Sequence, residues 1–182
     1  MQAETSRKNA KALIQTAVLE LLDERELRRI TVADIVRRAG VNRKSYYNHY
    51  YDQVEVVEDI VREFLDGLTA AWERYEGERD DSEGVIVEPL RHIRDNRELL
   101  GVLMRSDAER VLYRLYREYF IMQLGKWVRE YVPSVADDEY LLAYHFAGCY
   151  EMIRTWVLEG CVRDELEIAA VFGRALRAET RG

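Results

Sequence analysis

The chain has few of the residues that break helices or cross-link a fold. Its 182 residues include two prolines, ten glycines and two cysteines. Because proline and glycine disfavour helix interiors, their scarcity favours long helices over a turn-rich all-β fold. Cys149 and Cys161 form no Cys-x-x-Cys pair and no histidine cluster accompanies them, which argues against common zinc and redox motifs. If both lie on one helix, about 18 Å separates them along its axis, so we expect free thiols and no disulfide.

Long uncharged stretches are also missing. The longest covers residues 140–150, well short of the ~18 apolar residues that a membrane span needs. The N-terminus lacks the pattern of a signal peptide, since its short apolar stretch contains Gln15 and Thr16 and runs into acidic residues. We therefore expect a cytoplasmic protein with no membrane partner.

Acidic and basic residues are unevenly distributed along the chain. The net charge of −7 by itself argues against a nucleic acid as the partner. Residues 1–51, however, carry a net charge of +4, which leaves −11 for the remainder. A basic head on an acidic body predicts that only the head approaches a polyanion. Acidic domains that bind no DNA show similar fluctuations, so the charge alone leaves both interpretations open.

Hydrophobic periodicity predicts an all-α fold. Apolar residues at three-and-four spacing indicate an amphipathic helix over residues 5–24. Thr31, Asp34 and Gly40 suit the N-cap, the first turn and the C-terminal stop of a helix over 32–39. A loop is expected over residues 77–84. The other helices are expected over residues 43–49, 52–75, a segment ending near 96 whose start Pro89 leaves open, 98–105, 107–131, 137–160 and 164–179, which makes nine in all.

Residues 31–50 contain the strongest functional signal. A capped eight-residue helix, a turn at Gly40 and a second short helix capped by Asn42 form a helix-turn-helix. Small residues at Ala39 and Gly40 allow the two helices to cross closely. The major groove of DNA accepts one α-helix, whose N-terminal residues reach base edges. The second helix is expected to project Arg43, Lys44, Ser45, Tyr46 and Tyr47 outward.

The run ITVADIVRRAGVNRKSYYNHY, residues 30–50, resembles the DNA-binding domain of TetR-family transcriptional regulators. The resemblance covers about residues 8–65 and includes the Tyr-x-His-aromatic end of the second helix. Residues 148–160 are similar to the penultimate helix of one subgroup, whose last two helices pair across a dimer. The resemblance implies a three-helix DNA-binding head, residues 1–51, joined by a long helix to a helical ligand-binding and dimerisation bundle, residues 52–182.

The family pattern implies roles for individual residues of the head. Thr31 would contact a phosphate, and Tyr46 would pack on thymine methyls or sugars. The family usually has a lysine near the start of the fourth helix, where this chain has Gln53, so one phosphate contact is not carried over. Tyr50 is expected in the core, while Tyr47 and His49 suit either a core or a phosphate-contacting position, and Arg37 and Arg38 are expected on a solvated face. The expected DNA-binding residues are Thr31, Arg43, Lys44, Ser45, Tyr46, Tyr47 and His49.

The acidic body is rich in aromatic residues, which either pack as core or line a ligand site. The resemblance implies a small effector that shifts the spacing of two DNA-binding heads. The candidates for its pocket are Tyr116, Tyr119, Phe120, Tyr144 and His145. Apolar stripes on the last two helices predict a homodimer interface that contains Gly148, Met152, Trp156, Phe172 and Leu176. A two-fold pair would place the recognition helices about one DNA turn apart, ~34–36 Å.

These features predict a sequence-specific DNA-binding transcriptional regulator, a repressor in the commoner family outcome, that uses no cofactor or metal. An enzyme is disfavoured because His49, His92 and His145 are scattered and no HExxH, GxSxG, GxGxxG or P-loop spacing occurs. The alternative is a DNA-binding adaptor whose C-terminal body docks another protein. An adaptor should expose a large apolar patch, whereas an effector-responsive regulator should enclose a cavity.

Overall fold

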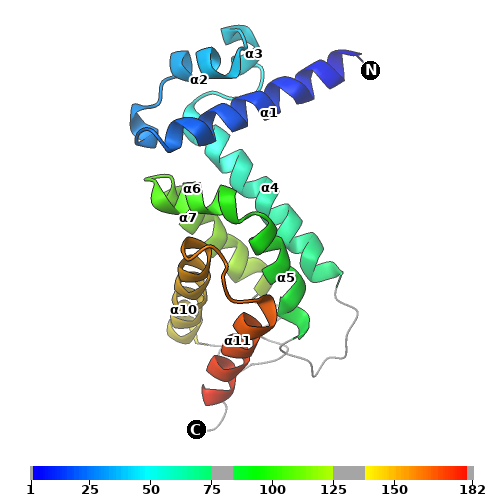
Figure 1. Ribbon diagram of the computed structural model, residues 1–182, viewed down its shortest axis with the longest axis vertical. Coiled ribbons are helices and arrows are strands. Elements are labelled where there is room, and N and C mark those ends of the chain that lie inside the picture. Colours follow the sequence, from blue (N-terminus) through cyan, green and yellow to red (C-terminus); the bar gives the residue numbers. More distant parts are fainter. Residues whose placement is uncertain (1, 75–83, 125–137, 180–182) are drawn as a thin grey trace. The chain divides into compact units, whose positions relative to one another are not determined.

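The computed structural model describes residues 2–74, 84–124 and 138–179, with side chains for 9–74, 85–122 and 138–175. Those residues form nine α-helices and no strand (Figure 1), so the predicted all-α class is confirmed. No helix in these ranges combines the length and hydrophobicity that a bilayer crossing requires. The helices are α1 (Gln2–Leu22), α2 (Val32–Ala39), α3 (Arg43–Tyr47), α4 (Gln53–Glu73), α5 (Gly84–Asp95), α6 (Arg97–Arg105), α7 (Glu109–Tyr119), α10 (Glu139–Leu158) and α11 (Glu165–Glu179).

The chain divides into two compact units. Unit 1 combines Met1–Glu63 with Gly101–Leu115, and unit 2 combines Phe64–Leu100 with Tyr116–Gly182. Helices α4, α6 and α7 each contribute residues to both units. The expected functional boundary between residues 51 and 52 stays a prediction, because these units are defined by contacts and not by function.

Unit 1 contains the helix-turn-helix. Helices α2 and α3 pack on α1 and on each other (Figure 1). Apolar side chains from all three helices, among them Ile14, Val18, Ile35 and Tyr46, are fully buried between them. Gly40 ends α2 with a φ of 67°, a left-handed conformation that favours glycine. The sequence therefore predicted this corner correctly.

Helix α3 is two residues shorter than expected. The backbone N–H groups of His49 and Tyr50 both donate to the carbonyl oxygen of Tyr46, at 2.9 and 3.0 Å. This arrangement ends the helix at Tyr47, with Asn48 as its C-cap. The chain then turns, and the Tyr50 ring lies buried in unit 1, as expected for that residue.

In unit 2, α5 packs against α11. Helix α5 begins at Gly84, so Pro89 lies inside it and not in its first turn. The expected loop over residues 77–84 falls almost entirely within residues 75–83, which lie outside the described residues.

The His92 ring stacks on Phe64 with centroids 5.1 Å apart, and its Nε2 is 3.0 Å from the Phe64 carbonyl oxygen. This contact attaches α5 to the unit 2 portion of α4.

The expected continuous helix over residues 107–131 is interrupted. Helix α7 gives way to a π-helical turn, η2 (Phe120–Leu124), and residues 125–137 lie outside the described residues. A π turn inserts one extra residue and so rotates the side chains that follow it. Here Phe120 is buried, with its ring centroid 5.3 Å from that of Phe146. Periodicity alone could not show this change of register.

The two cysteines are free, as expected. Helix α10 ends at Leu158, however, so Cys161 lies in the following turn and not on the same helix as Cys149. Gly160 and Cys161 have φ values of 81° and 56°, and this left-handed turn ends the helix. Burial raises the pKa of the Cys149 thiol to about 12, which keeps it protonated at neutral pH.

Candidate nucleic-acid interface

The N-terminus of α2 is held by a reciprocal capping box. The hydroxyl of Thr31 accepts from the Asp34 N–H at 3.2 Å and donates to Asp34 Oδ2 at 2.6 Å, while the Thr31 N–H donates to the same carboxylate oxygen at 3.1 Å. These bonds from Thr31, together with one from Arg37, lower the pKa of Asp34 to about 2. A DNA phosphate at Thr31 would therefore compete with Asp34 for the hydroxyl proton.

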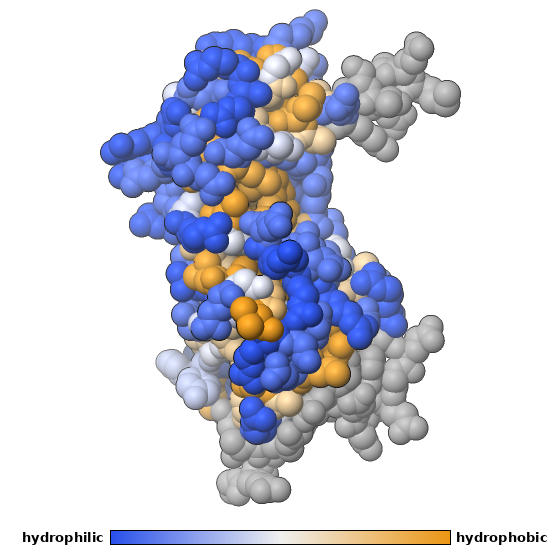
Figure 2. All heavy atoms as spheres, viewed as in Figure 1, coloured by the Kyte–Doolittle hydropathy of each residue, from blue (hydrophilic) through white to orange (hydrophobic). Residues whose placement is uncertain are grey.

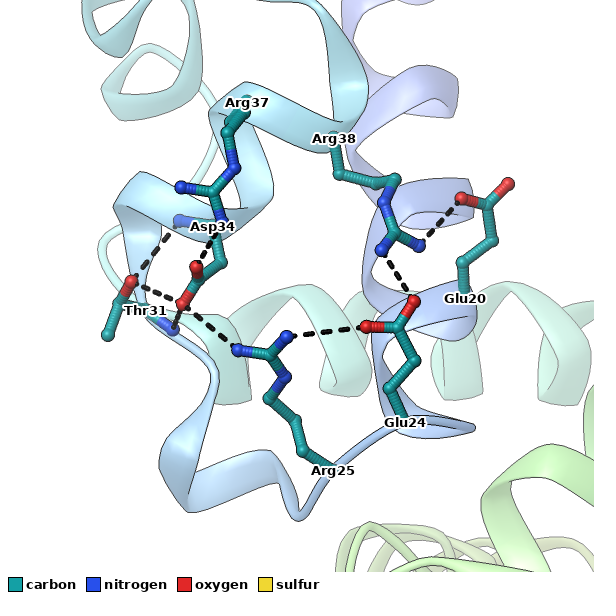
Figure 3. A network of polar contacts seen from close by, with 7 residues as sticks. All are labelled: Glu20, Glu24, Arg25, Thr31, Asp34, Arg37 and Arg38. Carbon is teal, nitrogen blue, oxygen red and sulfur yellow. Dashed lines mark hydrogen bonds and ion pairs between the residues drawn. The ribbon is translucent and has the colours of Figure 1, made fainter.

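Charges of alternating sign continue from this cap to the end of α1 (Figure 3). Arg25 lies 3.8 Å from Asp34 and 3.3 Å from Glu24. Arg38 lies 2.5 Å from Glu24 and 3.2 Å from Glu20. The chain of ion pairs joins α2 to the last turn of α1. Arg37 and Arg38 are exposed, as expected, and the ion pairs of Arg38 also link the two helices.

The cations of α3 differ from those of the rest of the head. The side-chain oxygen of Asn42 accepts from the Ser45 N–H at 2.8 Å and caps the helix. Arg43 and Lys44 are exposed, and Ser45 is half-buried. Neither Arg43 nor Lys44 has a carboxylate partner among the described residues. The surface over α2 is mainly hydrophilic in Figure 2. All other basic side chains of residues 9–51 are paired with carboxylates: Lys11, Arg25, Arg28, Arg29, Arg37 and Arg38.

The interpretation of Tyr46 as a base-contacting residue is wrong. Its side chain is 0% exposed, and burial raises the pKa of its hydroxyl. Tyr46 packs inward beside the buried ring of Tyr50, and the two ring centroids are 6.1 Å apart. Tyr47, one residue further around the helix, is 54% exposed and is the surface aromatic of α3. Tyr47 and Tyr51 have the same four-residue spacing as Tyr46 and Tyr50 but are exposed, so spacing alone does not distinguish the two pairs.

Two residues beyond α3 complete the exposed surface. His49 is half-buried, with its ring centroid 6.0 Å from that of Tyr50. Tyr51 is 83% exposed and was not predicted as a site residue. Its N–H donates to Glu55 Oε2 at 2.5 Å, which fixes the backbone at the start of α4. The position of Tyr51 directly after a buried tyrosine was the available signal.

Three of the five expected pocket residues lie together in unit 2. Tyr116, Tyr119 and Phe120 are buried, and with Phe146 and Tyr150 they form what we call the aromatic cluster. Its ring centroids are 5.3–6.2 Å apart, a spacing typical of packed aromatic side chains. Burial raises the pKa of the Tyr116 and Tyr119 hydroxyls.

The other two pocket candidates lie on α10. Tyr144 is 67% exposed, so its assignment to an enclosed pocket is wrong. His145, its neighbour, is half-buried. No group of three metal-ligating side chains occurs within the described part of the chain.

The residues expected at the dimer interface differ in their exposure to solvent. Gly148 is exposed, and Met152 and Phe172 are half-buried, while the side chain of Leu176 lies outside the described residues. Trp156 is 2% exposed, so its assignment to the dimer surface is wrong. Its indole N–H donates to the Arg163 carbonyl oxygen at 2.9 Å, and the Arg94 guanidinium lies 5.6 Å from the ring centroid. These contacts hold the α10–α11 turn within the chain's own fold.

Unit 1 has the architecture of a helix-turn-helix DNA-binding domain. A family model for the C-terminal region of transcriptional regulators matches residues 80–178, more than half of the chain. The chain belongs to the TetR family of transcriptional regulators, as the sequence predicted. Proteins of this family are DNA-binding transcription factors and not enzymes.

Individual proteins are similar to the chain in sequence or in fold. The uncharacterized HTH-type transcriptional regulator YxbF of Bacillus subtilis (strain 168) is 35% identical over 63 residues, which are 35% of this chain and 17% of that protein. A TetR transcriptional regulator from Streptococcus agalactiae 2603V has a similar structure, with a TM-score of 0.70, 20% identity and coverage of 94% and 95% of the two chains. For a TetR-family protein from Syntrophomonas wolfei the TM-score is 0.68, with 14% identity and 96% coverage of each chain.

Proposed function

We propose that the protein is a homodimeric repressor that binds a near-palindromic operator and is released by a small-molecule effector. The observation that carries DNA binding is the contrast among the basic residues of the head. Arg43 and Lys44 are exposed on α3 and lack carboxylate partners among the described residues, whereas the other cations in residues 9–51 are ion-paired. Only unpaired cations can meet phosphates or base edges without first losing an internal partner.

Selection of bound sequences from random duplex DNA tests this proposal. We expect two inverted half-sites with centres about one turn apart, 10–10.5 base pairs. Arg43→Ala and Lys44→Ala should weaken binding to the selected operator by about 1–3 kcal/mol each. Arg28→Ala is the matched control, because it also removes one exposed head cation but one that pairs with Glu26. Failure to enrich any sequence would contradict the proposal.

The exposed face of α10 supports dimerisation. Tyr140, Tyr144, Gly148 and Met152 are four residues apart, and the first three are exposed. A Cβ atom added at Gly148 would meet no atom within 4 Å. The glycine is therefore not required by packing within the subunit, and it leaves room for a second helix to approach. A second copy of the chain would cover this stripe about a two-fold axis.

Substitution of Gly148 by leucine separates the subunit fold from dimerisation. Gly148→Leu should leave the helical content intact, since the site is open in the subunit, and should yield a monomer by light scattering. Ala143→Leu, which adds a leucine at the other edge of the exposed face of α10, should remain a dimer. A monomeric wild-type protein at micromolar concentration would instead favour the adaptor, whose body docks another protein.

The aromatic cluster is the proposed effector site. It places buried hydroxyls beside aromatic rings in unit 2, and the Tyr119 hydroxyl lies 3.5 Å from that of Thr69. Apolar ligands with one or two polar groups suit such surroundings. We expect an aromatic or apolar metabolite to raise the melting temperature and to release the operator, and Phe146→Ala to change which compounds do so. A screen in which no compound alters either property would contradict the effector.

Transcription from a template that carries the selected operator tests repression. The wild-type protein should reduce transcript from a promoter that overlaps the operator, and the Lys44→Ala variant should not. An increase in transcript would show an activator. Because such a regulator acts on chromosomal DNA, we place it in the cytoplasm.

A further inference from the structure

A second polar network in unit 1 lies apart from the α2 cap and centres on Asp59 of α4. The Tyr50 hydroxyl donates to Asp59 Oδ2 at 2.6 Å. The same oxygen is 2.8 Å from Lys11 Nζ and accepts from Gln15 Nε2 at 3.2 Å, both on α1. One carboxylate oxygen thus collects donors from α1 and from the chain that leaves α3.

The contacts of Tyr50 extend from this carboxylate to α3. Its ring is buried, with centroid distances of 6.1 Å to Tyr46 and 6.0 Å to His49. Its N–H, like that of His49, donates to the Tyr46 carbonyl oxygen. The position of the Tyr50 ring therefore constrains the turn that carries His49 and the exposed ring of Tyr47.

Asp59 is held in its charged form although it is partly shielded. Burial on its own raises the pKa of this carboxyl, but hydrogen bonds from Lys11 and Tyr50 outweigh that effect and lower it below the usual range. The group borders an open polar pocket of about 150 Å³ that is also lined by His49 and Arg62. At neutral pH the Tyr50 hydroxyl therefore meets a carboxylate, which is a stronger acceptor than a neutral acid.

We infer that Asp59 is a positioning residue for DNA recognition, because it fixes Tyr50 and through it the end of the recognition helix. This role rests on the proposed DNA binding. Glu63, one turn further along α4, provides a matched control. It lies 2.7 Å from Lys11 Nζ and accepts from Gln15 at 3.1 Å, but it makes no hydrogen bond with Tyr50.

Four full-length proteins test the inference: wild type, Asp59→Asn, Tyr50→Phe and Glu63→Gln. Asp59→Asn and Glu63→Gln remove the same charge, which by itself should strengthen binding to DNA. We expect Asp59→Asn and Tyr50→Phe to weaken operator binding about tenfold, the equivalent of one charged hydrogen bond, while binding to random duplex changes little. Glu63→Gln should bind the operator at least as tightly as the wild type, and the Asp59→Asn, Tyr50→Phe double variant should be no weaker than either single variant.

The His49 ring gives a readout that is independent of DNA. The chain has three histidines, so the Hε1 resonance of His49 can be assigned by substitution of the histidines. It should move in Asp59→Asn and Tyr50→Phe and stay in place in Glu63→Gln. Tyr50→Phe keeps the buried ring and guards against a variant that fails to fold. If Asp59→Asn and Tyr50→Phe both keep wild-type affinity and an unmoved His49 resonance, the inference is overturned but the proposed function is not. A wild-type protein that selects no DNA sequence would overturn the proposed function.

Discussion

Neighbouring side chains of a short helix can have opposite roles, as Tyr46 and Tyr47 of α3 do. Tyr46 is buried, and its hydroxyl has no hydrogen-bond partner within the described part of the chain. A buried hydroxyl without a partner lowers stability by about 1–3 kcal/mol. Tyr47 is exposed beside Lys44 and can offer its hydroxyl to a phosphate. The two residues should therefore respond differently to the loss of a single oxygen.

We predict that Tyr46→Phe raises the free energy of unfolding by about 1 kcal/mol and leaves operator affinity unchanged. Tyr47→Phe should have the reverse effect, with unchanged stability and weaker binding, because it removes a hydroxyl at the surface. Chemical denaturation and fluorescence anisotropy measure the two quantities. Loss of affinity in Tyr46→Phe would restore Tyr46 as a DNA contact.

At the scale of elements, the capping box makes the stability of α2 dependent on pH. The pKa of Asp34 is about 2 in the folded protein, below its usual 3.8. The carboxylate therefore stabilises the fold above about pH 4, and this contribution is lost as the pH falls towards 2. Because Asp34 also binds Arg37 and lies near Arg25, its protonation weakens the ion pairs that join α2 to α1.

We predict that Asp34→Asn lowers the melting temperature at pH 7 and that the difference from the wild type shrinks as the pH approaches 2. Asn keeps the side-chain shape but loses the charge that strengthens these hydrogen bonds. Asp23→Asn, an exposed carboxylate after α1, is the control and should change little. Equal melting temperatures for Asp34→Asn and the wild type at neutral pH would contradict this account.

Contact between α4 and α5 depends on a glycine. A Cβ atom at Gly67 would lie 2.4 Å from Cε1 of His92, a ring that stacks on Phe64. We predict that Gly67→Ala lowers the free energy of unfolding by about 1–3 kcal/mol through overpacking, although alanine is the better helix former. Gly101→Ala should instead stabilise by up to about 1 kcal/mol, since the added atom meets only the far end of Arg105.

Thermal or urea unfolding compares the two glycine variants. Addition of His92→Ala to Gly67→Ala should recover part of the lost stability, because it removes the ring that the new methyl group meets. Stabilisation by Gly67→Ala alone would show that His92 moves aside without cost.

At the scale of the molecule, affinity for DNA depends on how many unpaired cations meet phosphates. The chain has a net charge of −7, so binding depends on local charge. Gln53 is half-buried in the first turn of α4, two residues after Tyr51. We predict that Gln53→Lys tightens binding to all duplexes and steepens the salt dependence by ~0.9 log units per log unit of salt.

Titration of the operator complex with salt measures that slope. Arg62→Gln, which removes a cation paired with Glu58 in α4, should leave the slope unchanged and serves as the control. An unchanged slope for Gln53→Lys would show that position 53 does not face the DNA backbone.

Local sequence rules predicted much of the head but not its surface. The cap at Thr31, the stop at Gly40 and the cap at Asn42 all depend on neighbouring residues, and each was predicted correctly. The burial of Tyr46 depends on the packing of α3 against α1 and α2, which no local rule describes. The assignments of Trp156 and Tyr144 failed for the same reason, since a stripe at helical spacing does not say which side of it meets the core.

The sequence by itself determined the all-α class, the helix-turn-helix and the family, because caps, glycine stops and periodicity act over a few residues. Only the tertiary structure decided which cations are available to DNA. Lys11, Arg25 and Arg38 find carboxylates on other elements of the fold. Arg28, Arg29 and Arg37 pair with carboxylates two or three residues away, whereas Arg43 and Lys44 have no carboxylate partner among the described residues. Net charge counts all of them equally, but an ion pair within the fold must be broken or shared before its cation can bind a phosphate.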